Sequence, residues 1–192
     1  MNSEDSRGRQ RISDYALATR LSYFLWSSTP DVELLRIAHA GTLSQPAILR
    51  QQVERLLSAP RGEALVRNFG GQWLGLREID FTTPDQELFP EFDELLQRSM
   101  VAETEHFLQH LLDKDLDVLQ VIDSKFTFLN ERLAAHYGVP DITGQDMRWL
   151  PLPEGSWRGG VLTQASVLKV TANGTNTSPV LRGAWVAEHI MG

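Results

Sequence analysis

The chain has 192 residues, of which 42% are hydrophobic and 22% are charged, a balance typical of a globular protein with one substantial core. Its net charge of −7 at pH 7 opposes binding to nucleic acid or to an anionic membrane surface, because both need a basic face. The absence of cysteine excludes disulfides, thiolate catalysis, zinc–thiolate sites and covalent c-type haem attachment within this chain. No apolar run is long enough to span a bilayer, and the polar start "MNSEDSRGRQR" lacks the apolar core of a signal peptide.

Apolar residues recur at helical spacing from residue 13 to about 138, which predicts a series of helices. The first should start at Ser13 or Asp14, the second at Thr29 and Pro30, and the third at Ser44. The predicted helical segments, in chain order, are 13–26, 29–38, 44–58, 60–79, about 90–113, 126–138, 158–170 and 178–192.

Glycine and proline mark two interruptions in this series. Gly70 and Gly71 lie inside the fourth segment, where they weaken a helix unless another part of the chain packs closely, so close packing is expected there. Residues 141–156 are rich in proline and glycine, with one short extended possibility at "MRWLPL", and are predicted to join two regions.

The predicted fold class is therefore mainly α, with little or no β structure. A bundle-like helical domain at 12–140 should be followed by the joint at 141–156 and by a smaller helical domain at 157–192, which we expect to be truncated from a longer parent protein.

The stretch "TANGTNTSPVLRGAW", residues 171–185, combines a small polar segment with an apolar helix. Gly174 tolerates a positive φ, Asn173 and the hydroxyl residues can bond nearby backbone, and Ser178 with Pro179 predicts a helix start. A helix N-terminus can hold an anion, to which Arg182 would add charge, but a capped helix after a surface turn explains the same pattern. The candidate residues of a binding loop are Asn173, Gly174, Thr175, Thr177, Ser178 and Arg182.

The segment "ETEHFLQH" supplies the main candidate for metal chemistry. Glu103, His106 and His110 are three and four residues apart, so they share one face of the longest predicted helix. Glu103 also lies on the apolar arc of that helix, which predicts that it is buried and paired with an arginine, Arg20 or Arg67. One helix face offers an incomplete ligand set, so a structural or surface role competes with ligation, and no bound transition metal is expected.

The quoted motifs together resemble a known family. They are "LATRLSYFLWSSTPDVELL", "NFGGQWLGLREID", "LFPEFDELLQRSMVAETE", "FTFLNERLAAHYGV" and "RGGVLTQASVLKVTANGTNTSPVLRGAWVAEHIMG". They are similar to two consecutive domains of unknown function in large exported c-type cytochrome proteins of planctomycetes and related bacteria. The residues of this chain that fall in the family's recurring motifs are Glu103, Glu105, Asn130, Glu131, His136, Tyr137 and the loop 173–179, whereas His106 does not belong to them.

The resemblance implies an extracytoplasmic, redox-linked parent protein whose c-type haem is carried by a separate domain. On this basis the chain is expected to be a non-haem accessory or interaction module, with no cofactor of its own, that packs against a haem domain or presents a binding surface. It should have no activity by itself.

Two other functions remain open at the level of sequence. The chain could be the catalytic core of a haem-linked oxidoreductase acting on an unknown, possibly polymeric substrate, with Glu103 and His136 as catalytic candidates. It could also be a carbohydrate-binding module if its tryptophans present coplanar rings on the surface; they are Trp26, Trp73, Trp149, Trp157 and Trp185.

Overall fold

The computed structural model describes residues 12–192, so the polar start at 1–11 lies outside it. The described chain forms two compact units, one ending at Asn68 and the other comprising Phe69–Gly192. The predicted joint at 141–156 lies inside the second unit. The predicted class is confirmed, because the fold is mainly α with a single small sheet among the described residues.

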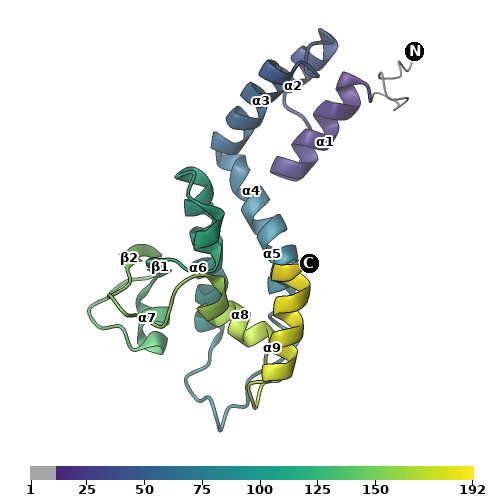
Figure 1. The fold of residues 1–192 in the computed structure, drawn as a ribbon. Coiled ribbons are helices and arrows are strands. Elements are labelled where there is room, and N and C mark those ends of the chain that lie inside the picture. Colours follow the sequence, from purple (N-terminus) through teal and green to yellow (C-terminus); the bar gives the residue numbers. More distant parts are fainter. Residues whose placement is uncertain (1–11) are drawn as a thin grey trace. The chain divides into compact units, whose positions relative to one another are not determined.

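The N-terminal unit is a group of helices packed around a leucine-rich core. It contains α1 (Asp14–Trp26), α2 (Val32–His39), α3 (Pro46–Ser58) and the short α4 (Glu63–Leu65). Both α2 and α3 contact α1 (Figure 1). The fully buried side chains of this core include Leu34, Leu43 and Leu56.

The caps of α1 and α2 follow the predicted chemistry, whereas α3 starts at Pro46, after the predicted Ser44, and has no side-chain cap. Ser13 accepts a hydrogen bond from the Ala16 amide at 3.2 Å, which confirms it as the cap of α1. The second helix begins later than predicted, because Asp31 rather than Thr29 caps it, accepting from the Leu34 amide at 2.9 Å. An aspartate cap is stronger here because its carboxylate also forms an ion pair with Arg55 at 2.7 Å.

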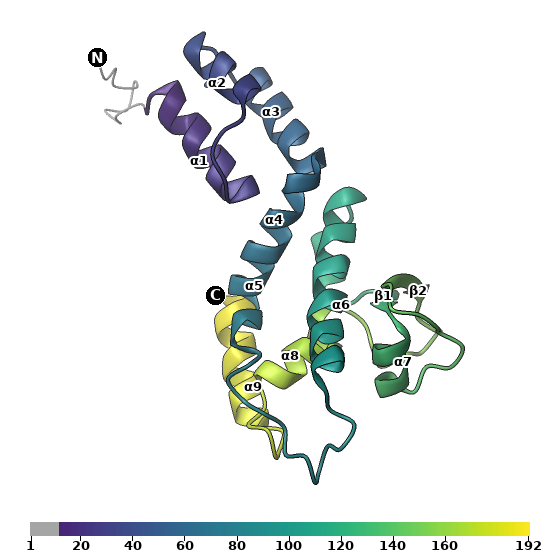
Figure 2. The same ribbon diagram turned by 180° about the vertical axis from the view of Figure 1, so that it is seen from behind.

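The C-terminal unit is built around the long helix α6 (Glu94–Asp113). Its other elements are α5 (Gly71–Trp73), β1 (Phe126–Leu129), α7 (Glu131–Tyr137), β2 (Arg148–Pro151), α8 (Ala165–Val170) and α9 (Pro179–Val186). In Figures 1 and 2, the sheet and α7 lie on one side of α6 and α9 lies on the other. Asp93 caps α6 at the Leu96 amide, so this helix starts four residues after the predicted Pro90.

A two-stranded antiparallel sheet replaces the start of one predicted helix. Residues 126–129, predicted to be helical, form β1, and Phe126 pairs with Pro151 while Leu129 pairs with Arg148 of β2. The segment contains two phenylalanines and the β-branched Thr127 and is buried along its whole length, which favours a strand. Asn130 then caps α7, which ends at Gly138 with φ +70°, as predicted for the helix end.

Close packing at the double glycine is confirmed. A Cβ at Gly70 would lie 2.7 Å from Cδ1 of Leu108, so any larger residue there would require the Leu108 side chain to shift. The backbone around it, Val66–Gly70, forms a wide helical turn rather than a regular α-helix.

Residues 141–156 lie within the C-terminal unit and contribute to its structure. They supply β2, and Ala165 beyond them shares a core cluster with Leu96 of α6 and with Leu129 and Leu133. Apolar burial therefore joins the segments on either side of the predicted joint. Within the described chain, no helix combines the length and the apolar character that crossing a membrane requires.

Candidate binding pocket

Glu103 lies inside the C-terminal unit, as its position on the helical wheel predicts. It is 1% exposed, and its carboxylate accepts hydrogen bonds from the hydroxyls of Thr127 at 2.6 Å and Tyr137 at 2.5 Å. The predicted pairing with an arginine is wrong. Arg20 and Arg67 belong to the N-terminal unit, where Arg67 is 3.9 Å from Glu63. A helical wheel shows which face is buried but not which elements cover it, and here those elements are β1 and α7.

Burial raises the pKa of Glu103 from its ordinary value of 4.5 to about 7. The two hydroxyl donors and the positive charge of Arg158 oppose this rise, because each stabilises the carboxylate. The pKa of the Tyr137 hydroxyl is raised well above 10, by burial first and then by the neighbouring Glu103. Near neutral pH the carboxyl group is therefore partly protonated, while the phenol keeps its proton.

Tyr137 connects this buried carboxyl group to an open pocket. Its hydroxyl donates to Glu103 and accepts a hydrogen bond from the Ala165 amide at 2.8 Å, which holds α7 against the start of α8. The guanidinium carbon of Arg158 lies 3.6 Å from the centre of the tyrosine ring. The ring is thus fixed by hydrogen bonds at its hydroxyl and by a cation on its face.

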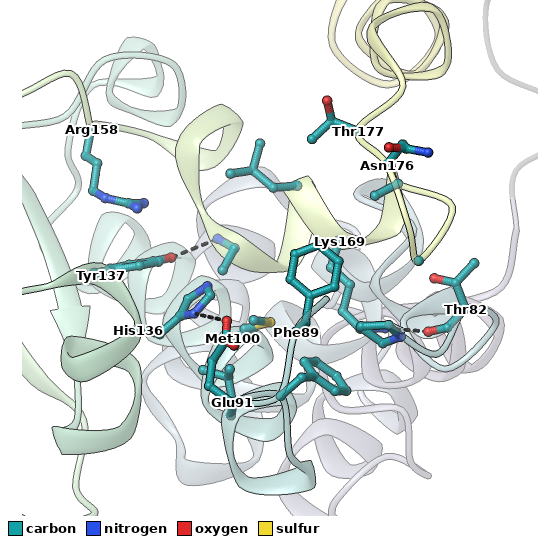
Figure 3. A pocket seen from close by; sticks show the side chains of 17 residues that line it. Thr82, Phe89, Glu91, Met100, His136, Tyr137, Arg158, Lys169, Asn176 and Thr177 are labelled. Carbon is teal, nitrogen blue, oxygen red and sulfur yellow. Dashed lines mark hydrogen bonds and ion pairs between the residues drawn. The ribbon is translucent and has the colours of Figure 1, made fainter. Parts of the chain in front are cut away.

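The pocket has a volume of about 200 Å³ and lies entirely within the C-terminal unit (Figure 3). Its wall is mainly apolar, with polar groups spaced around it. The lining residues are Thr82, Pro84, Phe89, Glu91, Phe92, Leu96, Met100, His136, Tyr137, Arg158, Ala165, Leu168, Lys169, Ala172, Gly174, Asn176 and Thr177.

Two polar side chains that line the pocket, Lys169 and His136, interact with neighbouring groups of the chain. The Lys169 ammonium donates hydrogen bonds to the carbonyls of Thr82, at 2.9 Å, and Ile79, and burial lowers its pKa. His136 lies 4.0 Å from the Glu91 carboxylate, and burial nevertheless lowers the pKa of its imidazole below 6.5. His136 is therefore mostly neutral at pH 7.

The turn at 171–178 is ordered by its own side chains, as predicted. The Asn173 side-chain oxygen accepts hydrogen bonds from the amides of Thr175 at 3.1 Å and Asn176 at 2.7 Å. Ser178 caps α9 by accepting from the Leu181 amide at 3.3 Å. These bonds confirm the predicted local structure, an Asx-type turn followed by a capped helix.

Only part of the predicted binding loop reaches the pocket. Gly174 and Thr177 line it, whereas Asn173, Thr175 and Ser178 stabilise the turn and the helix start. Arg182 donates to the Thr171 hydroxyl at 3.2 Å and is not among the lining residues. The role of this loop in binding stays a prediction.

Gly174 brings the turn into contact with the segment that precedes α6. Its φ is +88°, and a Cβ at this position would lie 2.7 Å from the carbonyl oxygen of Thr83. Its own carbonyl accepts a hydrogen bond from the Asp85 amide at 3.0 Å. The turn therefore forms one edge of the pocket by direct backbone contact with residues 83–85.

Comparison with protein families follows the same segments. Residues 12–139 match the family model PSD4, described as a protein of unknown function (DUF1592). The chain belongs to this family. Residues 158–192 match a second model, PSCyt3, described as a protein of unknown function (DUF1588). The names of the two models indicate planctomycete cytochrome-type proteins, which confirms the resemblance seen in the sequence motifs. No curated protein and no solved structure matches the chain.

Both matched segments of this DUF1592 family member contribute to one pocket. Phe92 and His136 lie in the first match, and Arg158, Leu168 and Thr177 lie in the second. The pocket is therefore assembled only when the DUF1592 and DUF1588 segments pack together. The chain is a cytochrome-associated domain of unknown function.

The three metal candidates of the DUF1592 segment do not converge. Glu103 is bound inside by hydroxyls, whereas His106 is exposed, with Nδ1 2.9 Å from the Ala102 carbonyl, and the His110 ring packs on Phe126 at 5.0 Å. Within residues 12–192 no three histidine, aspartate or glutamate side chains are grouped so that they could hold a metal ion. The chain also lacks the cysteines that attach a c-type haem covalently.

Two tryptophans of the C-terminal unit, Trp149 and Trp157, are exposed. Trp149 stacks on Phe126, and Trp157 lies against the Arg158 guanidinium. The ring contacts of the described chain include no pair of tryptophans. Carbohydrate binding by the exposed Trp149 and Trp157 stays a prediction.

Sequence reasoning from periodicity missed Tyr137, Arg158 and Lys169. Tyr137 was named only through the family motif, and Arg158 and Lys169 stand in short segments without a recognisable spacing. These three residues line the pocket because α7, α8 and the loop before α8 pack around it. No local sequence pattern indicates this packing.

Proposed function

We propose that this chain is a non-haem accessory module of an extracytoplasmic, multidomain cytochrome protein, and that its C-terminal unit binds a small, largely apolar ligand. The observation that carries the proposal is the pocket of about 200 Å³, built jointly by both family segments. A concave, mainly apolar site with a few polar groups is the usual form of a small-molecule site.

The packing of the unit supports a ligand site over a packing defect. The pocket is a concave, mainly apolar surface that is open to solvent, and contiguous exposed apolar patches of this kind commonly mark ligand-binding sites. Here the space is bordered by Leu96 and Ala165, which are fully packed on their other sides within the core cluster. The pocket therefore lies next to a well-packed core.

The proposed relation to a haem domain rests on the family and on composition. Both family names point to cytochrome-type proteins, and this chain has no cysteine with which to attach a haem. The haem of such a parent would be carried by another domain, against which this module would pack or to which it would deliver its ligand.

Binding can be tested with the neutral apolar fluorophore N-phenyl-1-naphthylamine and the full 192-residue chain. We expect saturable fluorescence enhancement by the wild type and its loss in Leu168→Trp, which places an indole in the pocket. Val180→Trp adds the same indole at a side chain that is 81% exposed and outside the lining, and it should bind like the wild type. Equal enhancement in all three proteins would contradict the proposal, provided that circular dichroism shows the same helix content.

A catalytic role is the second candidate, because a carboxyl group with a pKa of about 7 is hydrogen-bonded to a tyrosine that lines the pocket. A pKa near the working pH is favourable for general acid–base catalysis. The catalytic role would belong to the haem-linked parent. Substrate oxidation by that parent should fall at least 100-fold in Glu103→Gln if Glu103 transfers a proton, and unchanged turnover would exclude it.

A further inference from the structure

We propose that the ligand of this pocket is an apolar molecule bearing one carboxylate, and that the carboxylate binds the guanidinium group of Arg158. The inference rests on the proposed binding function and specifies its ligand class. Arg158 is half-buried at the pocket wall, beside the ring of Tyr137 (Figure 3).

The guanidinium of Arg158 is held in place by its neighbours, but most of its hydrogen-bond donors make no bond within residues 12–192. Nη1 donates to the Thr163 carbonyl at 3.0 Å, and the group rests on Tyr137, with Trp157 4.4 Å away. In the part of the chain that the structure describes, no carboxylate lies within ion-pair distance of it. A guanidinium has five donors in a planar fork that matches a carboxylate, so most of its donors are available to a ligand.

The other charged groups of the lining already have partners. Lys169 donates to two backbone carbonyls, and Glu91 lies beside His136. Among residues 12–192, Arg158 is thus the charged lining group whose side chain makes a single hydrogen bond, to the Thr163 carbonyl, and no ion pair. In a chain with a net charge of −7, a cation with free hydrogen-bond donors on an apolar wall favours an anion with an apolar body.

The size and the walls of the pocket indicate the body of the ligand. A dry cavity of roughly 150 Å³ is known to hold a benzene molecule, so about 200 Å³ suits a body near the size of two fused rings. Phe89, Phe92 and Tyr137 present aromatic surfaces to it. An aromatic carboxylate of this size fits both the walls and the cation.

Glu103 provides a second, independent readout. Arg158 favours the charged form of Glu103, so a ligand carboxylate on Arg158 would offset that effect and favour the protonated form. Binding should then take up protons and tighten as the pH falls from 8 to 6. The groups that face Glu103 are Thr127 from β1, Tyr137 from α7 and Arg158, and the pKa of the Tyr137 phenol is raised well above 10, so it keeps its proton in this range.

His136 also lines the pocket and gains charge at low pH, which would favour an anion as well. The two contributions can be separated, because Glu103→Gln removes the first and His136→Gln removes the second. We expect the proton uptake between pH 8 and 6 to be largely lost in Glu103→Gln and retained in His136→Gln.

The direct test is titration calorimetry of the full chain with 2-naphthoate and with its neutral analogue 2-naphthamide. We expect the carboxylate to bind at least tenfold more tightly, as is usual for a hydrogen-bonded ion pair. Arg158→Gln should reduce the affinity for naphthoate to the affinity for the amide. Arg158→Lys should bind naphthoate with an intermediate affinity. Arg148→Gln removes an exposed arginine that does not line the pocket and should behave like the wild type.

The outcomes separate the two proposals. Equal wild-type affinities for the acid and the amide, or a preference that survives in Arg158→Gln, would overturn the carboxylate assignment and leave the binding function standing. Failure of both compounds, together with failure of the neutral fluorophore, would overturn both. The comparison of acid and amide needs only the wild-type chain, so it remains decisive even if a variant at Arg158 does not fold.

Discussion

Glu103 is a carboxyl group whose charge is set by its surroundings rather than by its chemistry alone. Burial favours the neutral form, whereas Thr127, Tyr137 and Arg158 favour the charged one, and the balance leaves a pKa of about 7. A buried group of this kind couples the stability of the C-terminal unit to pH.

The first prediction concerns that coupling. Since the pKa of Glu103 is about 7 in the folded chain and near 4.5 when unfolded, the folded state holds the extra proton between these values. The free energy of unfolding should therefore decrease by about 2–3 kcal/mol from pH 5 to pH 8 through this group. Urea unfolding at intervals of pH should show this slope in the wild type and its loss in Glu103→Gln.

The difference between the two proteins isolates Glu103 from other titrating groups. His136 acts in the opposite direction, because its lowered pKa makes stability fall as the pH drops below about 6.5. Glu87→Gln, at an exposed carboxylate, should retain the wild-type slope. Identical slopes for wild type and Glu103→Gln would show that the carboxyl group is not perturbed.

Gly174 and Gly183 form a matched pair for a second prediction. Gly174→Ala forces an alanine to φ +88° and places its Cβ against the Thr83 carbonyl, so it should destabilise the chain by more than about 1 kcal/mol and weaken fluorophore binding. Gly183 lies in α9, where an added Cβ would meet no other atom within 4 Å, so Gly183→Ala should stabilise by about 0.5–1 kcal/mol. Thermal unfolding measures both; a harmless Gly174→Ala would show that the turn can move away.

The metal prediction from the sequence also belongs to this scale. Glu103, His106 and His110 share a helix but not a common site, since one is buried and another exposed. We expect elemental analysis of the purified chain to find no transition metal near one ion per molecule. A stoichiometric metal that is lost in His106→Ala would instead require the three side chains to rearrange.

The elements of the C-terminal unit are linked through polar residues at their ends. Asn130 is the main example: its side-chain oxygen caps α7 at the Leu133 amide at 3.0 Å, and its amide nitrogen donates to Ser99 of α6 at 2.8 Å. One buried side chain thus fixes the start of α7 against α6, and Tyr137 lies at the other end of the same short helix.

We therefore predict that Asn130→Ala affects the pocket as well as stability. It removes a cap and a buried hydrogen bond, which should lower the free energy of unfolding by about 2–3 kcal/mol and weaken ligand binding through displacement of Tyr137. Ser178→Ala is the control, because its cap on α9 is exposed and its loss should cost about 1 kcal/mol without a large change in binding. Chemical denaturation and fluorophore titration distinguish the two.

At the scale of the whole molecule, the chain consists of two units with separate cores. The core of the N-terminal unit contains Leu34 and Leu56, and the core beside the pocket contains Leu96 and Leu133. Both family segments contribute to the C-terminal unit, so sequence families and compact units divide this chain at different places.

Because the two units have separate cores, we expect a substitution in one core to lower the stability of that unit without unfolding the other. Leu34→Ala should lower the stability of the N-terminal unit by about 2–5 kcal/mol, and hydrogen exchange should accelerate in residues 14–68 while fluorophore binding persists. Leu133→Ala should have the reverse pattern, with faster exchange in the C-terminal unit and loss of binding. Uniform acceleration across the chain in either variant would show that the two units unfold together.

Much of the local structure could be predicted from the sequence. Apolar periodicity and capping residues indicated the helices, Gly138 marked the end of α7, and the bonding capacity of Asn173 and Ser178 indicated the turn before α9. These features depend on interactions within a few residues, so a short window of sequence contains the groups that determine them.

Only the tertiary structure decided the partner of Glu103, the strand at 126–129 and the pocket. Each depends on segments far apart in the chain: Thr127 and Tyr137 reach Glu103, β2 pairs with β1, and Arg158 lies over Tyr137. A helical wheel or a propensity describes one segment, whereas these contacts follow from which segments share a core. The sequence thus determined the helices, the inward face of α6 and the capped turn, and packing determined where their polar groups meet.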